Sequence, residues 1–347
     1  MKAPQVTRRE ALKLAVGSAA YAAAGLAHPG RLFAADPLKV MNLGFALGIH
    51  CPPTKGLVEE LPKLGVEIEM QRFQRTRDSV QAVIGGAGEV GVSGPIVVLR
   101  GTQAGNDLRI LGNFYLHASL VVAANTDQIK SWKDFEKSDV TVGINSQGDI
   151  TQVLIIGGLL RNGVDVGKVN WADVGGSGSR MRALLAKRIQ ATVIHFDQIP
   201  LVQKEGNYTA MLEPAKMYDP WVNEVVYCRG EWLERPENRD RAVKVMKAVI
   251  SASRKANGSF DYYKDSFLKY ATIKGKENMP DDAMRAYWDA IAHQIGVWPA
   301  DNRFQRSNFE KLMPYYKAAK AVDADKPIDL AKVVDTTVVE QALKELG

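Results

Sequence analysis

The sequence predicts an α/β protein of two lobes, each with a mainly parallel sheet flanked by helices. Two observations support this prediction. Strand-like and helix-like segments alternate along the chain, which is typical of parallel strands joined by helices. The alternation then restarts after Asn125, which indicates a second unit of the same kind. A length of 347 residues is enough for two domains.

The first unit begins with a strand and then alternates. Its predicted strands span residues 38–45, 66–73, 89–93, 108–115 and 118–124. Its predicted helices span residues 52–64 and 76–84, with a third from Pro95. The strand at 66–73 alternates apolar and polar side chains with a period of two. Gly85-Gly86 ends the helix at 76–84.

The second unit repeats the pattern over residues 126–220. Its predicted strands span residues 140–144, 191–194 and 208–212, and its predicted helices span 131–135, 149–161 and 178–186. The helix at 149–161 is apolar nearly all round, which predicts that it is buried.

Residues after Trp221 change character again. One strand is predicted at 222–228, and long amphipathic helices follow from Pro236, from Asp281 and around Phe309. Because these helices come with a single strand, we expect them to pack on the first unit. Lobe 1 is then discontinuous, with residues 36–125 and 221–347, and lobe 2 spans 126–220. The expected crossovers lie near 125 and 221.

The first 35 residues are typical of an export signal. They have a basic start with Arg8-Arg9, a short apolar middle and a small-residue end. The paired arginines resemble the bacterial twin-arginine signal, so we expect a periplasmic protein whose signal is removed after Ala35 or Ala27. The apolar run is too short to span a bilayer, and no later stretch has about 18 uninterrupted apolar residues.

The formal net charge of +6 overstates the charge of the exported chain. Five cationic side chains and one carboxylate lie in the first 35 residues, so the remainder is near +2. That balance is too mild to predict nucleic-acid binding. Cys51 and Cys228 could be paired or free, because their spacing does not show whether they meet. The sequence has no zinc-ligand spacing and no P-loop, so we expect no metal and no other cofactor.

Four segments, taken in order and spacing, carry a family resemblance. They are Leu38–Gly48; Ser79–Gly86 with Glu89–Pro95; Trp132–Phe135 before Val140–Gly143; and Arg182–Ala191 ahead of His195–Asp197. Together they resemble the periplasmic substrate-binding proteins of ABC importers, in the group that binds alkanesulfonates, taurine and pyrimidines. The last segment departs from the family pattern, with Arg188, Gln190, His195 and Gln198 in place of Gly, Asp, Trp and Pro.

This resemblance implies the type II periplasmic-binding-protein fold, with a ligand cleft between the lobes. The implied ligand is a small organic anion (sulfonate- or carboxylate-like) or a heteroaromatic compound. The implied partner is an ABC permease in the inner membrane. The implied protein is a monomer and not an enzyme.

Candidate ligand-binding residues in lobe 1 follow the ends of predicted strands, where α/β proteins bind ligands. They are Gly48, Ile49 and His50 after the first strand, Arg75 after the second, Ser93 and Gly94 after the third, and Tyr115 and Trp221 as aromatic walls. Each has a plain structural alternative: a turn, a helix cap, a solvated charge or core packing.

Candidate residues in lobe 2 are of the same kind. They are Ser146, Gln147, Gly148, Asp149 and Thr151, which join a strand to a helix; Gly176 and Ser177 in a glycine-rich loop; and His195 and Asp197 at a strand end. Ser146 and Asp149 have the spacing of a capping box, so helix capping without a ligand is the alternative. Arg180 and Arg182 are expected to be solvated surface charges.

Two other function classes stay open. Some relatives of this fold are enzymes, including a desulfinase with a nucleophilic Cys before a Pro, and Cys51-Pro52 occupies a similar place. A periplasmic sensor that presents its ligand to a membrane kinase is the third possibility, and the sequence does not separate it from a transporter component.

Overall fold

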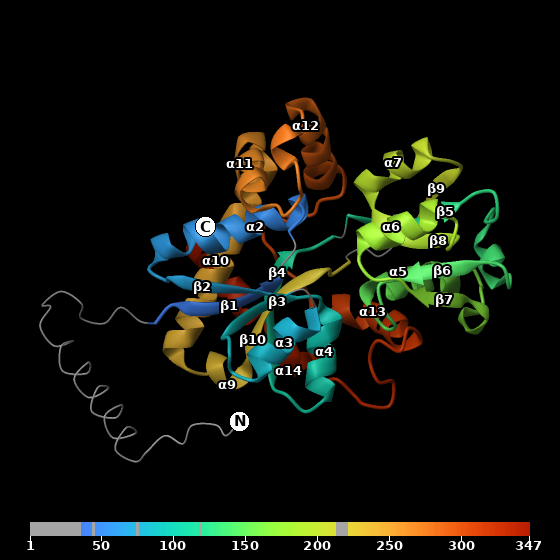
Figure 1. Ribbon diagram of the computed structural model, residues 1–347. Coiled ribbons are helices and arrows are strands. Elements are labelled where there is room, and N and C mark those ends of the chain that lie inside the picture. Colours follow the sequence, from blue (N-terminus) through green and yellow to red (C-terminus); the bar gives the residue numbers. More distant parts are fainter. Residues whose placement is uncertain (1–35, 44–45, 74–75, 118, 213–220) are drawn as a thin grey trace, which may run out of the picture. The chain divides into compact units, whose positions relative to one another are not determined.

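Five strands form the first sheet among the described residues of the computed structural model (Figure 1). Their order across the sheet is β2 (Ile68–Phe73), β1 (Leu38–Leu43), β3 (Val90–Ser93), β10 (Glu224–Arg229) and β4 (Leu108–Tyr115). β1 pairs in parallel with β2 and β3, whereas β10 pairs in antiparallel with β3 and β4. The carboxyl ends of β1, β2, β3 and β4 therefore share one edge of the sheet with the start of β10.

The second sheet repeats this plan. Its order is β7 (Asn170–Asp173), β6 (Thr141–Ile144), β8 (Ala191–His195), β5 (Leu120–Asn125) and β9 (Tyr208–Leu212). β6 pairs in parallel with β7 and β8, and β5 is antiparallel to both β8 and β9. Each sheet is thus mainly parallel, as predicted. Each also contains one antiparallel strand, β10 in the first sheet and β5 in the second. The short β7 was not predicted, because its half-exposed residues have no strong apolar pattern.

The structure describes residues 36–43, 46–73, 76–117, 119–212 and 221–347. The predicted export signal (residues 1–35) and Arg75 lie outside this part, and residues 37–347 form one unit. Among the described helices, none combines the length and the apolar character that crossing a membrane requires.

The first passage of the chain between the sheets differs from the expectation. We expected the strand at 118–124 to belong to lobe 1 and the chain to cross near residue 125. The structure places this strand, β5, in the second sheet, so the passage lies between Tyr115 and Leu120. β4 and β5 are both buried apolar strands, and their composition does not show which neighbour each one pairs with. The return passage lies between β9 and β10.

Both faces of each sheet are covered by apolar cores. In the first sheet, Met41 and Ile110 pack in one core, and Val40 and Val226 pack in the other. In the second sheet the two faces likewise contribute to separate cores. Burial on both faces explains why most of these strands are continuous apolar runs in the sequence.

The helices associated with the first sheet come from both ends of the described chain. They are η1 (Gly48–His50), α2 (Cys51–Lys55), η2 (Gly56–Glu60), η3 (Pro62–Leu64), α3 (Thr76–Ile84), α4 (Pro95–Gln103), α9 (Gly230–Leu233), α10 (Pro236–Gly258), α11 (Phe260–Tyr270), η7 (Lys276–Asn278), α12 (Asp281–Asp289), η8 (Ala290–Gln294), α14 (Leu330–Val333) and α15 (Thr337–Leu346). The amphipathic helices predicted from Pro236 and Asp281 are α10 and α12.

The second sheet has its own helices and receives one more from the C-terminal region. Its own helices are η4 (Trp132–Glu136), α5 (Ile150–Arg161), η5 (Val166–Lys168), α6 (Ser177–Leu185), η6 (Phe196–Gln198) and α7 (Ile199–Lys204). We expected all helices after residue 221 to pack on the first unit, but α13 (Arg306–Ala318) contacts α5 (Figure 1). The apolar side chains of α13 extend the core of α5, a contact that the period of α13 alone does not reveal.

The helix predicted over 52–64 is broken into three kinds of turn. α2 is α-helical, η2 is a π-helix and η3 is a 3₁₀ turn. Pro62 has no N–H to donate to the preceding turn, and the Leu61 N–H donates to the Gly56 carbonyl, five residues earlier, at 3.0 Å. The missing N–H of Pro62 therefore explains why the regular α-helix does not continue to the end of this segment.

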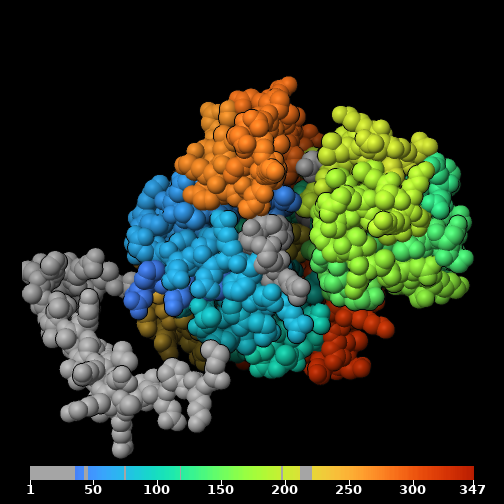
Figure 2. Space-filling model, in the orientation of Figure 1, coloured from blue at the N-terminus to red at the C-terminus, as the bar shows by residue number. Residues whose placement is uncertain are grey.

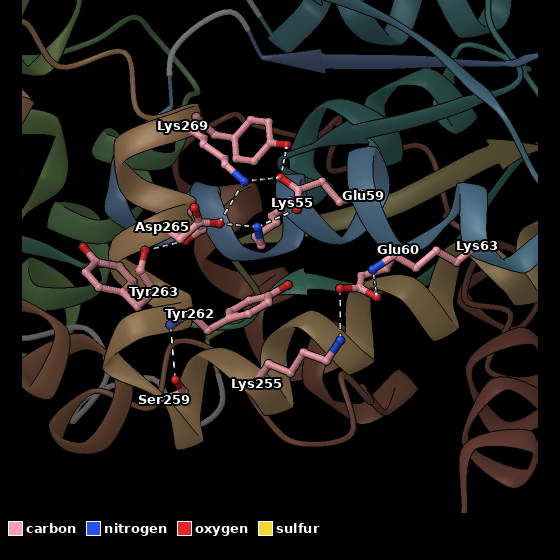
Figure 3. Close-up of polar contacts among 12 residues, drawn as sticks. Lys55, Glu59, Glu60, Lys63, Lys255, Ser259, Tyr262, Tyr263, Asp265 and Lys269 are labelled. Carbon is pink, nitrogen blue, oxygen red and sulfur yellow. Dashed lines mark hydrogen bonds and ion pairs between the residues drawn. The ribbon is translucent and has the colours of Figure 1, made fainter.

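An ionic network holds α2 and η2 against α11 (Figure 3). Lys55 Nζ donates to Glu59 Oε2 at 2.6 Å and also to Asp265 of α11. Tyr270 and Lys269 of the same helix donate to Glu59 Oε1 at 2.7 and 3.3 Å. The network fixes the position of the helix that follows His50.

Candidate functional site

His50 lies at the edge of the first sheet, just after β1, and is 4% exposed. Its ring Nδ1 accepts a hydrogen bond from the Leu47 N–H at 3.1 Å, so in the neutral ring the proton is on Nε2. That Nε2 is 3.4 Å from the Tyr115 hydroxyl and 3.8 Å from Glu224 Oε1. The short turn η1 thus directs the imidazole toward the carboxyl end of β4 and the first residue of β10.

Tyr115 is part of a hydrogen-bonded chain that starts at Trp221. Trp221 Nε1 donates to Asn223 Oδ1 at 3.1 Å, and Asn223 Nδ2 donates to the Tyr115 hydroxyl oxygen at 2.6 Å. Burial, reinforced by the charge of Glu224, raises the pKa of Tyr115 well above its usual value. Tyr115 therefore keeps its phenolic hydrogen as a donor.

Ser93 and Glu224 complete the polar part of this edge. Glu224 pairs with Tyr115 across β10 and β4, and Val225 pairs with Ser93 across β10 and β3. Both polar side chains are buried. Among the described residues, neither Ser93 Oγ nor Glu224 Oε2 has a hydrogen-bond partner. We call His50, Ser93, Tyr115, Asn223 and Glu224 the first-edge cluster.

Gly48 is required for a reason that the sequence does not show. A Cβ at this position would lie 2.6 Å from Tyr287 Cε1 and would also collide with the hydroxyl of Tyr263. The space beside Gly48 is therefore filled by two tyrosines of the same chain. Its neighbour Ile49 belongs to the core, and the Ile49 carbonyl accepts from Trp298 Nε1 at 2.9 Å.

His195 lies at the corresponding edge of the second sheet. Its Nδ1 is 2.8 Å from the Ser119 hydroxyl. Gln198 Oε1 accepts from the His195 N–H at 3.0 Å and from the Ser177 hydroxyl at 2.7 Å. Burial, with the nearby charges of His50 and Arg180, lowers the pKa of His195 to about 3. The ring is therefore neutral at ordinary pH, with one nitrogen donating and the other accepting.

A small cavity of about 70 Å³ lies between the loop after β1, helices α11 and α12, and the edge of the second sheet. Leu47, Phe267, Ile273, Met279, Tyr287, His195 and Gln198 line it. Beside it, Phe196 of η6 stacks on Tyr287 of α12, with 5.4 Å between ring centroids and 7° between planes. Figure 2 shows the surface of α11 and α12 (orange) beside that of α6 and α7 (yellow-green). The cavity has room for only a few water molecules, so a larger occupant requires the edges to separate.

The segment Ser146–Thr151 is used mainly within the protein. Asp149 is the N-cap of α5, and its Oδ1 accepts from the N–H groups of Thr151 and Gln152 at 3.1 and 3.2 Å. The sequence predicted capping here, but with Ser146 as the cap; the structure gives that role to Asp149. Burial raises the pKa of the Asp149 carboxyl.

Two neighbours of this cap differ in their exposure. Gly148 has a φ of +71° and lies against Ala321, whereas Ser146 and Gln147 are exposed. Gly148 therefore supports packing with the C-terminal segment, while Ser146 and Gln147 stay accessible to solvent.

The glycine-rich loop before α6 is held by a buried arginine. We expected Arg180 to be a solvated surface charge, but it is 4% exposed. Its Nε donates to the Val193 carbonyl at 2.9 Å, and another guanidinium nitrogen donates to the Gly175 carbonyl. Burial lowers the pKa of Arg180 to about 10. Gly176 is the N-cap of α6. The two hydrogen bonds of Arg180 therefore hold this loop against β8.

Both cysteines are buried and free. The Cys51 thiol donates to the Leu47 carbonyl at 3.1 Å, and burial raises the pKa of both thiols far above the usual value. A pair between Cys51 and Cys228 is therefore absent. A thiol held protonated in this way is a poor nucleophile.

The structure thus brings together five of the predicted residues. They are His50, Ser93, Tyr115 and Trp221 at the first edge, and His195 at the second. Gly94 is the N-cap of α4, next to Ser93. Arg75 and the side chain of Asp197 lie outside the described residues.

Other residues at these edges were missed. They are Ser119, Gln198, Asn223, Glu224 and Tyr287. Glu224 had a signal that could have been used: it is a carboxylate inside the apolar run 222–228, where a charge is costly unless paired. Tyr287 had none, because its spacing in α12 is that of an ordinary core position. Among the described residues, no group of three potential metal ligands occurs.

Comparisons with known proteins agree with this arrangement. A family model described as NMT1/THI5 like matches residues 62–257. The structure is similar to the periplasmic aliphatic sulphonate binding protein SsuA from Escherichia coli, with a TM-score of 0.64 and 13% identity over 87% of this chain and 92% of that one. A search of curated proteins finds no match.

Two further solved structures are similar. The periplasmic nitrate-binding protein NrtA from Synechocystis PCC 6803 has a TM-score of 0.66 and 13% identity, over 89% of each chain. The ligand binding component of an ABC-type import system from Staphylococcus aureus has a TM-score of 0.67 and 14% identity, over 89% of this chain and 99% of that one. At these identities the likeness establishes the fold, and it confirms the predicted type II periplasmic-binding-protein fold.

Proposed function

This chain belongs to the NMT1/THI5-like family, and on that premise we propose that it is the periplasmic solute-binding component of an ABC uptake system. It binds a small organic molecule between its two sheets and delivers it to a permease in the inner membrane. The family, the fold and the names of the similar structures support this proposal together.

One observation supports the location of the binding site above all. A cavity lies between Leu47, in the loop that leads from β1 to His50, and the edge of the second sheet at His195 and Gln198. His50 is near enough to His195 for its charge to act on that ring. α/β proteins bind ligands at such edges. Because the chain passes twice between the sheets, the two halves can move apart and close around a solute by hinge motion.

We propose that the ligand contacts come from the residues predicted by the sequence that reach this region. They are His50, Ser93, Tyr115, His195 and Trp221, with Gly48, Ile49, Gly94, Gly176 and Ser177 supporting them. Arg75, Asp197, Ser146 and Gln147 are further candidates. Asp149 and Thr151 serve the helix cap, and Gly148 packs against the C-terminal segment. The ligand is a small organic anion of sulfonate or carboxylate type, or a heteroaromatic compound.

Export and assembly are also part of the proposal. The paired arginines of residues 1–35 support export by the twin-arginine route, with removal of the signal in the periplasm. We propose that the mature protein is a monomer without a cofactor. A role as a sensor would use the same binding site, and the identity of co-transcribed genes would separate the two.

A thermal-shift screen of the mature protein tests the proposal. We expect at least one member of a panel of sulfonates, carboxylates and pyrimidines to raise the melting temperature, because binding to the folded state stabilises it. Native mass spectrometry of protein taken from its own periplasm identifies a solute that co-purifies. The proposal fails if no small solute binds and deletion of the gene leaves uptake unchanged.

The enzyme alternative receives no support from Cys51. Its thiol is buried, is bonded to a backbone carbonyl and has a strongly raised pKa. Turnover of an aryl sulfinate that disappears in Cys51→Ser would reverse this conclusion.

A further inference from the structure

Glu224 is an under-satisfied carboxylate at the first sheet edge. Its side chain is 7% exposed, and Oε1 lies 3.8 Å from His50 Nε2. The Tyr115 hydroxyl also hydrogen-bonds to this carboxylate. Its Oε2 has no hydrogen-bond partner among the described residues. A carboxylate has room for about four hydrogen bonds, and a buried charge is costly without them. The Glu224 carboxylate can therefore accept a hydrogen bond from an additional donor at Oε2.

A second buried polar group without a partner lies at the same sheet edge. Ser93 Oγ is fully buried and has no hydrogen-bond partner among the described residues. Ser93 pairs with Val225, so its side chain lies on the face of the sheet opposite to that of Glu224. Folded proteins leave few buried polar groups unpaired, so two at one sheet edge are informative.

Nearby cations in the described part of the chain are engaged elsewhere. Arg180 donates to two backbone carbonyls, and Lys276 Nζ donates to the Ala271 carbonyl at 2.6 Å. His195 contributes a neutral ring. A sulfonate or carboxylate placed against the first-edge cluster would meet Glu224, a like charge.

We propose that Glu224 is the specificity-determining anchor of the site, and that it selects a solute whose buried end presents N–H donors. Such a solute is an amine, an amidine or an amino-substituted heteroaromatic ring. This inference rests on the proposed function and narrows its ligand class, because it disfavours a ligand whose buried end is an anion.

Four probes that share a six-membered aromatic ring separate the alternatives. They are benzamidine (a cation with N–H donors), 2-aminopyridine (N–H donors), benzenesulfonate and benzoate. We expect the first two, at millimolar concentration, to raise the melting temperature of the mature protein, and the two anions to leave it unchanged. The solute identified by native mass spectrometry is expected to carry an amino, amidine or ring N–H group.

Glu224→Gln keeps the size of the side chain and removes its charge. We expect it to weaken binding of benzamidine by about 10- to 100-fold, and that of 2-aminopyridine by less, because a charge-assisted hydrogen bond becomes a neutral one. Glu205→Gln, an exposed change on the same protein, is the matched control and leaves both affinities unchanged. Glu224→Asp keeps the charge and draws the carboxylate back by one methylene group. We expect it to weaken binding of benzamidine several-fold, which keeps the test available if Glu224→Gln does not fold.

The outcomes distinguish this inference from the proposed function. If only the anions bind, or if Glu224→Gln and Glu224→Asp both keep full affinity for the N–H probes, the inference is wrong while solute binding stands. Binding of benzenesulfonate that is lost in Arg75→Ala would show that Arg75 makes an anion site. If no probe binds, a co-purified solute without an N–H group overturns the inference, and one with it supports the inference. The absence of any bound solute contradicts both.

Discussion

Gly48 shows, at the scale of a single residue, how tightly the first sheet edge is built. The two tyrosines that occupy the space of its missing side chain come from α11 and α12, more than 200 residues later in the sequence. The same edge carries His50, whose imidazole is fixed by a backbone donor. Here the tertiary contacts, and not the turn itself, require a residue without a side chain.

Gly48→Ala is expected to displace Tyr287 and to lower the free energy of unfolding by about 1–3 kcal/mol, because a methyl group has no room there. Urea unfolding measures the change. Gly258→Ala is the matched control, since a Cβ at Gly258 meets nothing within 4 Å. A Gly48→Ala variant as stable as the wild type would show that the tyrosines move away at no cost.

At the scale of an element, α2 and η2 depend on side chains from α11. Burial alone raises the pKa of Glu59, but the hydrogen bonds from Lys55, Tyr270 and Lys269 outweigh it and bring the pKa to about 2. The ionised carboxylate is therefore stabilised in the fold. Its contribution is fully present above the unfolded-state value near 4.5 and is lost as the pH falls from there toward 2.

The free energy of unfolding is accordingly expected to fall when the pH is lowered from about 5 to about 3. Glu59→Gln makes this fall smaller, because the glutamine does not titrate. Urea unfolding at a series of pH values gives both profiles. Glu69→Gln, at an exposed position on β2, keeps the wild-type profile. Identical slopes for Glu59→Gln and the wild type would rule out this role for the network.

At the scale of the whole described unit, Phe196 connects the two sheets. Its ring packs against the cores of both sheets and stacks on Tyr287 beside the shared cavity. An aromatic pair of this kind contributes about 0.5–1.5 kcal/mol beyond its buried area. The stack therefore favours the arrangement in which the two edges touch.

Phe196→Ala is expected to increase the ratio of open to closed molecules by roughly 2- to 10-fold, the factor that this energy corresponds to. Small-angle X-ray scattering of the ligand-free mature protein would show a larger radius of gyration. Leu201→Ala, an exposed change on α7, serves as the control. An unchanged scattering curve for Phe196→Ala would mean that the stack does not hold the edges together.

Much of the fold was predictable because local patterns determine local structure. The helix at 76–84 and the strands at 108–115 and 208–212 occur as predicted, since their apolar periods and turn residues agree. The partner of β5 and the position of α13 were not predictable, because both depend on long-range packing. The break in the helix over 52–64 had a local cause, Pro62, that was not used.

The candidate site was predictable only in part. His50, Ser93 and His195 were found because they follow strand ends, and a parallel sheet brings such ends to one edge. Asp149 and Arg180 have polar groups that suit a ligand, but the structure commits them to a helix cap and to backbone carbonyls. Tyr287 was missed, because a residue on a distant helix reaches the edge only through the fold.

The sequence by itself determined the class of fold, the order of its strands along the chain and the family resemblance, because these follow from local periodicity and short motifs. The tertiary structure alone decided which polar groups are already satisfied and which are not. Whether Glu224 is paired depends on His50 and Tyr115, which come from two other segments. Hydrogen-bond satisfaction is a property of atoms close in space, and the order of residues does not contain it.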